Sequence, residues 1–276
     1  MRSRSGLRRT SRGLILALFA AQGWAQDQRP LPRGAPEVFI ATLPRVHVRV
    51  HEELDPDRLR ELARPGVTLW LSTRTNTLRG STVENIARFD TAWVQLRVPL
   101  KPFDVQVFSK LPAAGGWIDV DSLSLAGRVR RIAFELRGPL DELLAAKVRA
   151  AKPTEFRWAP DASVDLLSWG QFRQLPGRRV IVAGPETLLP VKCTERRSGD
   201  PSLELHVASL LALSSEVYPC GVGSRVVVPP ETESWLLQSL LVRDPSIELV
   251  LDIGADSARA LAARGLLERL QFGAAR

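Results

Sequence analysis

An α/β protein made of repeated strand–helix units around one parallel sheet is the fold class that this sequence predicts, with a β/α barrel as the expected closure. A five-residue pattern alternates polar or aromatic residues with apolar ones, and a period of two is typical of a strand. The pattern recurs about every 22 residues without an intervening linker, which leaves room for a turn, a short helix and another turn. The copies lie at 47–51, 70–74, 93–97, 117–121, 133–137, 155–159, 179–183, 204–208, 225–229 and 248–252.

The two faces of these strands differ in polarity, and this difference bears on how the sheet closes. Apolar residues such as Val48, Val94 and Ile118 share one face, which must carry the helices, whereas the other face is polar. An eight-stranded barrel fits the chain length, and its inward polar side chains would pair with one another or line a cleft. An open horseshoe solenoid is the alternative, because its concave surface is solvated, but the Asn or Cys ladder of leucine-rich repeats is missing.

Helices are expected where a capping residue precedes an apolar periodic segment. Asp55 followed by Pro56 begins the first, and Ser81 with Glu84 forms a capping box for the second. The connection at 123–130 is too short for more than one or two turns. The expected helices cover 55–63, 81–89, 139–151, 163–175, 231–242 and 256–270.

The first 25 residues have the pattern of a secretory signal peptide. Five arginines precede a short apolar segment at 14–21, and small residues at Gly23 and Ala25 indicate cleavage before Gln26. The alternative is an uncleaved membrane anchor. It is less favoured, because the apolar segment is shorter than the ~20 residues that span a bilayer. Residues 26–36 are proline-rich and predict a flexible segment, and 37–276 a single β/α-repeat domain. The mature chain is therefore expected in the periplasm or outside the cell, with no membrane span.

The charge distribution bears on whether the protein binds nucleic acid, and the two cysteines bear on whether it contains a disulfide. The chain has 38 Lys plus Arg against 30 Asp plus Glu, and the signal peptide holds five of those arginines and no acid. The remaining basic residues alternate with acids, so no nucleic-acid partner is expected. Cys193 and Cys220 predict a disulfide in an exported protein, with two buried free thiols as the alternative. No cofactor motif is present, no cofactor is expected, and the oligomeric state is left open.

Ligands of parallel β/α proteins bind at the carboxyl ends of the strands, which directs attention to the polar residues there. Asp121, Glu135 and Asp252 lie at or near these ends and are candidate catalytic residues, because paired carboxylates act as acid and base or as acid and nucleophile in glycoside cleavage. The alternative is that each carboxylate is neutralised by a neighbouring arginine, as Glu135 would be by Arg97 or Arg137.

Three tryptophans suggest a surface for sugar rings. Trp70, Trp93 and Trp117 occur at nearly equal spacing, and strands in register would place them side by side on the polar face. Aromatic faces stack on sugar rings, and nearby charged groups bind hydroxyls. Alternatively, the three rings fill the inside of a barrel. The candidate ligand-binding residues are Trp70, Trp93, Trp117, Arg74, Arg97, Arg137, His51 and His206.

The histidines also lie on the polar face. In an eight-stranded barrel the unit with His206 would be beside the unit with His51, and these two with an aspartate could hold a metal. Ion-paired histidines explain the same pattern, and no metal site is assigned.

The favoured function is the binding of a ligand, with a glycan as the preferred class, by an exported protein. The first alternative is a glycan or ester hydrolase that uses the strand-end carboxylates, with Arg74 and Arg97 holding the substrate. The second is a structural envelope protein. No catalytic motif decides whether the protein is an enzyme.

Overall fold

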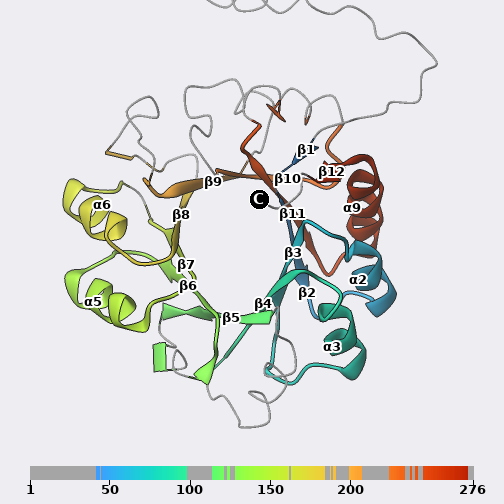
Figure 1. The fold of residues 1–276 in the computed structure, drawn as a ribbon, viewed down its shortest axis with the longest axis horizontal. Coiled ribbons are helices and arrows are strands. Elements are labelled where there is room, and N and C mark those ends of the chain that lie inside the picture. The colour runs from blue at the N-terminus through green and yellow to red at the C-terminus, as the bar shows by residue number, and fades with distance from the viewer. Residues whose placement is uncertain are drawn as a thin grey trace, which may run out of the picture. The chain divides into compact units, whose positions relative to one another are not determined.

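The computed structural model shows a closed barrel of parallel strands, which confirms the β/α barrel; the open horseshoe is wrong (Figure 1). Successive strands pair around the ring, and β11 pairs with β2 to close it. Strands β1 and β12 form a separate two-stranded parallel sheet. The structure describes residues 42–43, 45–97, 114–120, 123–124, 128–161, 163–183, 187, 189–190, 199–206, 224–233, 237, 240–241 and 245–272.

The strands and helices alternate along most of the chain. The strands are β1 (Thr42–Leu43), β2 (Val46–His51), β3 (Val67–Ser72), β4 (Thr91–Gln95), β5 (Ala114–Asp119), β6 (Ile132–Arg137), β7 (Glu155–Ala159), β8 (Arg178–Ala183), β9 (Ser202–His206), β10 (Arg225–Val228), β11 (Glu248–Gly254) and β12 (Gln271–Phe272). The helices are α2 (Pro56–Leu62), α3 (Gly80–Ile86), α5 (Glu142–Ala151), α6 (Leu166–Arg173) and α9 (Ser257–Arg269).

The number of strands in the ring differs from the expectation. Each of the ten copies of the five-residue pattern overlaps one barrel strand, and all ten strands belong to one ring, so the eight-stranded version is wrong. A chain of this length accommodates ten units because the unit is short, with a strand about every 22 residues, and the connection between β5 and β6 is shorter still. The wider ring has more interior to fill.

The main apolar core lies between the barrel and the helices around it, which Figure 1 shows outside the ring. Leu71, Val94 and Ile118 point outward and are buried in this core. Leu62 of α2 and Phe172 of α6 are fully buried against such strand residues. The assignment of strand faces from the alternation is therefore confirmed for these positions.

The first two helices differ in how they begin. Asp55 caps α2 by accepting a hydrogen bond from the Asp57 amide at 2.8 Å, with Pro56 at the first position. The capping box of Ser81 and Glu84 is wrong, because α3 begins at Gly80 and Ser81 already lies inside its first turn. The helix expected at 231–242 lies only partly within the described residues.

Caps also explain why two further helices begin later than expected. Asp141 accepts from the Leu144 amide at 2.7 Å and starts α5, and Asp165 accepts from the Ser168 amide at 2.8 Å and starts α6. The helices begin where these carboxylates satisfy free amides of the first turn.

The strands are staggered around the ring. Trp70 pairs with Trp93, but Trp93 pairs with Gly115, and Trp117 lies opposite Gln95. Trp117 therefore lies two residues nearer the carboxyl ends than the other two tryptophans. The expectation that all three tryptophans lie side by side is wrong for Trp117. Closing a parallel sheet requires tilted strands, and tilt produces this stagger.

Strand β8 has the opposite phase to its sequence pattern. Arg178 points into the barrel and donates to Glu248, whereas Arg179 hydrogen-bonds outside it to the carbonyls of Arg173 and Gly199. The pattern had placed Arg179 at the inward position. Its apolar middle, residues 180–182, offers no polar residue to set the phase.

Candidate functional site

Ion pairs occupy the barrel interior at the amino ends of the strands. Arg225 donates to both oxygens of Glu155 at 2.6 and 2.8 Å, and its Nε donates to Glu248 at 3.2 Å. Arg178 donates to Glu248 at 3.0 Å. Burial opposes ionisation of Glu155 and Glu248. Arg225 outweighs burial at Glu155, and the hydrogen bond from His47 together with Arg178 and Arg225 outweighs it at Glu248, so both pKa values lie below the usual range. These two arginines and two glutamates balance in charge.

His47 links this cluster to the tryptophans. Trp70 Nε1 can only donate, and it lies 3.0 Å from His47 Nδ1, so this nitrogen is the acceptor. The proton of the neutral ring is thus on Nε2, which donates to Glu248 Oε2 at 2.8 Å. Burial and the charge of Arg225 lower the pKa of His47 to about 4, so the ring is neutral at pH 7.

A second set of ion pairs runs along the interior nearer the carboxyl ends. Glu204, which is 0% exposed, accepts at one oxygen from Arg49 and from Arg157, the latter at 2.9 Å. Arg157 also donates to Glu135 at 3.2 Å, and Arg137 donates to the other oxygen of Glu135 at 3.1 Å. Burial opposes ionisation of Glu204, but Arg157 and Arg49 hold its pKa well below the usual range. This chain of side chains contains three cations and two anions.

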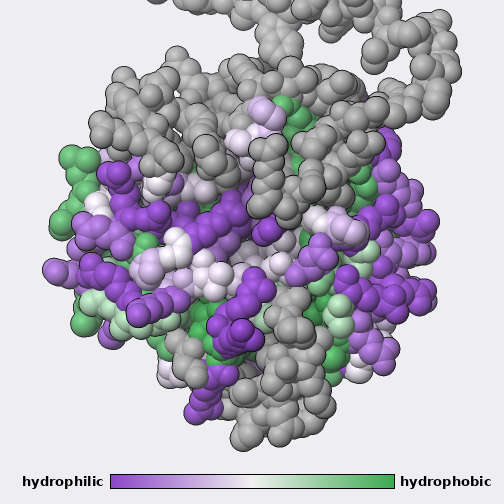
Figure 2. All heavy atoms as spheres, viewed as in Figure 1, coloured by the Kyte–Doolittle hydropathy of each residue, from purple (hydrophilic) through white to green (hydrophobic). Residues whose placement is uncertain are grey.

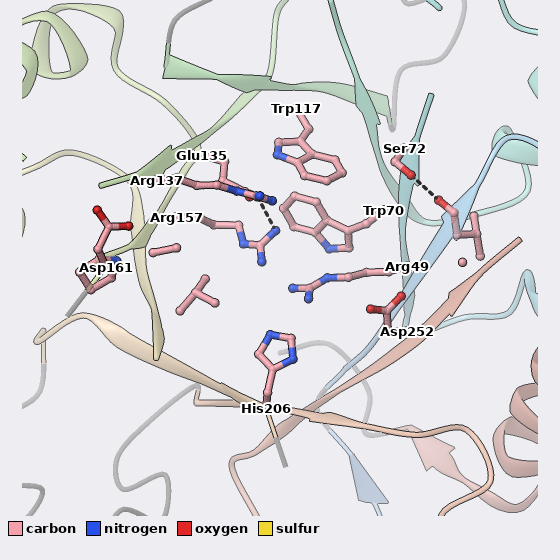
Figure 3. A pocket seen from close by; sticks show the side chains of 15 residues that line it. Arg49, Trp70, Ser72, Trp117, Glu135, Arg137, Arg157, Asp161, His206 and Asp252 are labelled. Atoms are coloured by element: carbon pink, nitrogen blue, oxygen red, sulfur yellow. Dashed lines mark hydrogen bonds and ion pairs between the residues drawn. The ribbon is translucent and has the colours of Figure 1, made fainter. Parts of the chain in front are cut away.

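A cavity of about 630 Å³ lies beside this second set of ion pairs, at the carboxyl ends of the strands. Figure 3 shows Arg49, Arg157 and His206 entering it from different strands, with the two arginines beside the Trp70 ring and His206 on the side away from the tryptophans. Viewed as in Figure 1, hydrophilic residues lie over the middle of the ring (Figure 2). The side chains that line the cavity include those of Arg49, Trp70, Ser72, Trp117, Glu135, Arg137, Arg157, Asp161, Val182, His206 and Asp252.

A β-bulge shapes one wall of the cavity. In the backbone register of β11 and β2, Asp252 lies opposite Arg49, but Gly254 lies opposite Val50, so β11 has one extra residue here. Gly254 has a φ of 63°, in the left-handed region that glycine adopts without strain. Bulges re-aim side chains at strand ends. This one directly follows Asp252, which together with its register partner Arg49 lines the cavity.

His206 contributes a polar group of a different kind. Burial lowers its pKa, although the charge of Glu204 acts in the opposite direction. A neutral imidazole, one nitrogen a donor and the other an acceptor, is therefore the main form at pH 7.

Six of the predicted site residues line this cavity, and the structure brings them together from five strands. They are Trp70, Trp117, Glu135, Arg137, His206 and Asp252. Both oxygens of Glu135 accept hydrogen bonds from arginines, Arg137 among them, as expected if this carboxylate is a partner in structural ion pairs. Asp121, Cys193 and Cys220 lie outside the described residues, and the predictions on them remain predictions.

The other predicted residues do not line the cavity. Trp93 is buried beneath Trp70, with ring centroids 5.6 Å apart in a stacked arrangement, and fills the barrel as the alternative proposed. His51 accepts from the Glu53 amide, Arg74 pairs with Glu53 at 3.0 Å, and Arg97 donates to the Thr73 carbonyl at 2.7 Å. All three therefore make contacts within the adjoining connections.

The expected neighbourhood of His51 and His206 is wrong. Strands β10 and β11 separate β9 from β2, because the ring has ten strands and not eight. Within the described part of the chain, no group of three or more His, Cys, Asp and Glu side chains is placed to hold a metal.

Sequence reasoning missed Arg49 and Arg157 as site residues. Each is the third residue of its five-residue pattern and so belongs to the polar face, but it precedes the strand end, and the cavity extends to the middle of β2 and β7. Their position on the inward face next to three interior glutamates was the available signal.

Fold and site together define a ten-stranded parallel β/α barrel with an ion-paired interior and a polar, tryptophan-lined cavity at its carboxyl ends. No protein-family model matches this chain, and no curated protein matches it either. Among the described residues, no helix is both long enough and apolar enough to cross a bilayer.

Proposed function

We propose that this barrel binds a sugar, free or at the end of a glycan, in the cavity at the carboxyl ends of its strands. The observation that carries the proposal is the combination of the half-buried indole ring of Trp117 with fixed hydrogen-bond donors and acceptors in one cavity of about 630 Å³. A sugar ring needs both, because it has apolar C–H faces and a rim of hydroxyls.

The aromatic part of the cavity comes from Trp70 and Trp117. Their rings meet edge to face, with centroids 5.6 Å apart. Trp70 is 1% exposed, stacks on Trp93 and has the Arg157 guanidinium 5.0 Å from its ring centroid, so the ring face available for stacking is that of Trp117. Trp117 is only half-buried, and its Nε1 has no hydrogen-bond partner among the described residues. The half-buried ring therefore offers a face for stacking.

The polar part comes from side chains that are already held in place. Arg157 is 4% exposed and is oriented by Glu135 and Glu204, so little conformational entropy remains to be lost on binding. Arg49 and Asp252 are register partners on β2 and β11. A guanidinium donor beside a carboxylate acceptor suits the adjacent hydroxyls of one sugar ring.

A hydrolase using the strand-end carboxylates has weaker support. A general acid must carry a proton that it gives to the leaving group. Glu135 accepts hydrogen bonds from Arg137 and Arg157 at its two oxygens, so neither oxygen is left to give a proton to a leaving group. Asp252 has no such pairing on the described residues, so Asp252→Asn, assayed on aryl glycosides and aryl esters, is the test of this alternative.

We also propose that binding takes place in the periplasm or outside the cell. The support is the arginine-rich start, apolar segment and small residues of the first 25 positions.

The binding proposal is tested by isothermal titration with glucose, galacturonate and N-acetylglucosamine, and with their β-1,4 or α-1,4 disaccharides cellobiose, digalacturonate and chitobiose. At least one of the three series should bind, and Arg137→Gln should weaken that binding at least about tenfold through loss of a charged hydrogen bond.

Arg97→Gln is the matched control for this titration. Arg97 also follows a strand, but it does not line the cavity, so this variant should bind like the wild type. Equal losses in Arg137→Gln and Arg97→Gln, or no binding of any of the six ligands, would contradict the proposal.

A further inference from the structure

The geometry points to a site with two adjacent lobes that takes a ligand of at least two consecutive sugar units. This inference rests on the proposed function, and it specifies the length of the ligand.

A second cavity of about 510 Å³ adjoins the one already described. Four residues, Ser72, Trp117, Glu135 and Arg137, line both cavities, so the two are neighbouring lobes that share a wall. Each lobe by itself falls within the ~300–1,000 Å³ typical of a pocket for one small molecule. The pair therefore has room for two linked units and is larger than one ring needs.

The shared wall contains a half-buried indole and a guanidinium. Trp117 reaches this position because the stagger of β4 and β5 sets it two residues nearer the carboxyl ends than Trp93. The Arg137 side chain is 80% exposed while its Nε and one terminal nitrogen are held by Glu135. A ring face and a donor at the junction suit the linkage between two sugar rings.

Each lobe also has polar residues of its own. Gln95 and Asp119, from β4 and β5, line only the smaller lobe. Arg49, His206 and Asp252 line only the larger one. The larger lobe has more donors and acceptors and should hold the unit that binds first, with the second unit in the smaller lobe.

The experiment compares each of the three monosaccharides with its disaccharide, by isothermal titration on the wild type and on lobe-specific variants. In a series that binds, the disaccharide should bind at least about tenfold more tightly than the monosaccharide. Asp119→Asn should weaken the disaccharide at least about threefold and leave the monosaccharide unchanged, whereas His206→Ala should weaken both.

Gln95→Ala repeats the smaller-lobe test without removing a charge, and urea midpoints equal to that of the wild type confirm that each variant is folded. A monosaccharide that binds as tightly as its disaccharide overturns the two-lobe inference and leaves the proposed function standing. So does a disaccharide affinity that neither Asp119→Asn nor Gln95→Ala changes. If none of the six ligands binds, the proposed function fails, and the inference fails with it.

Discussion

Buried ionisable side chains inside this barrel act mainly on one another. Glu204 makes the point, because a carboxylate with no solvent exposure stays ionised between Arg49 and Arg157. Removing one partner from such a set leaves an uncompensated buried charge, which costs more than the intact set contributes. At the scale of the residue, the interior charges are therefore positioning groups that orient the arginines of the cavity.

His47 makes stability depend on pH in a defined window. The unfolded chain takes up a proton near the ordinary histidine value of 6.5, but the folded protein takes it up only at about 4. Between these values the unfolded state binds more protons, so the free energy of unfolding falls as the pH falls, by at most about 3 kcal/mol. Urea unfolding at several pH values between 7 and 4.5 measures this slope.

His47→Gln should reduce the slope in that window, and the contribution of His206, whose pKa is also lowered by burial, should remain. His51→Gln, on the same strand at its more exposed end, should keep the slope of the wild type. The same slope in His47→Gln and in the wild type would show that this histidine does not couple folding to pH.

Gly115 makes room for the stacked tryptophans. A Cβ at this position would lie 2.5 Å from Trp93 Cζ3 and 2.9 Å from the Arg131 carbonyl oxygen. Gly115→Ala should therefore lower the free energy of unfolding by ~1–3 kcal/mol, as overpacking does. Gly265→Ala, in α9 with open space around the new methyl group, should be neutral or add up to ~1 kcal/mol. Urea midpoints compare the two, and a larger loss for Gly265→Ala would contradict this account.

At the scale of the strand, the alternation decides what each position tolerates. A slip of one residue would exchange the two faces and bury charges such as Asp119 among apolar side chains. The faces of β4 are thus strongly specified, with Val94 in the core between barrel and helices and Gln95 toward the cavity.

Neighbouring residues of β4 should therefore respond in opposite ways. Val94 is 1% exposed, and Val94→Asp should unfold the protein, because an unpaired buried charge costs several kcal/mol. Gln95→Ala should be tolerated, since it loses only long hydrogen bonds of 3.3 and 3.4 Å and changes ligand binding at most. Urea midpoints of both variants provide the measurement. A greater loss for Gln95→Ala would refute the assignment of faces.

At the scale of the whole molecule, ring closure brings together residues that are far apart in the chain. Glu155 and Arg225 are 70 positions apart, and His47 and Glu248 are 201 apart, yet each pair is in hydrogen-bond contact. The cavity exists because the ring is wide enough for its middle positions to remain open to a ligand.

Cys193 and Cys220 should form a disulfide in the mature protein, because an isolated cysteine pair in an exported chain is usually oxidised. Thiol titration of the denatured, unreduced protein should find no free thiol. Two free thiols would contradict the prediction.

We expect residues 1–25 to act as a signal peptide that is removed on export. Expression with residues 1–25 in a Gram-negative host should yield a periplasmic product that begins at or close to Gln26, and N-terminal sequencing identifies that residue. A membrane-bound product that retains 14–21 would show an uncleaved anchor instead.

The sequence by itself determined the β/α class, ten strand positions and the inward or outward direction of most strand residues. These properties are local, because a period of two follows from the backbone of a single strand. The exception is β8, which has no polar residue in its middle, so its pattern does not show that Arg178 and not Arg179 points inward. The inward direction of Trp70, Trp117, Glu135 and His206 was thus predictable.

Only the tertiary structure decided that all ten strands close one ring, how they are staggered and which charges meet. The stagger places Trp117 two residues nearer the carboxyl ends than Trp93. Closure of the ring brings Arg49, Arg157 and Glu204 into contact from three strands. Tilt and closure depend on packing around the entire barrel, so no single repeat contains the information. The cavity arises from the same cause, because it lies between side chains whose spacing only the closed ring defines.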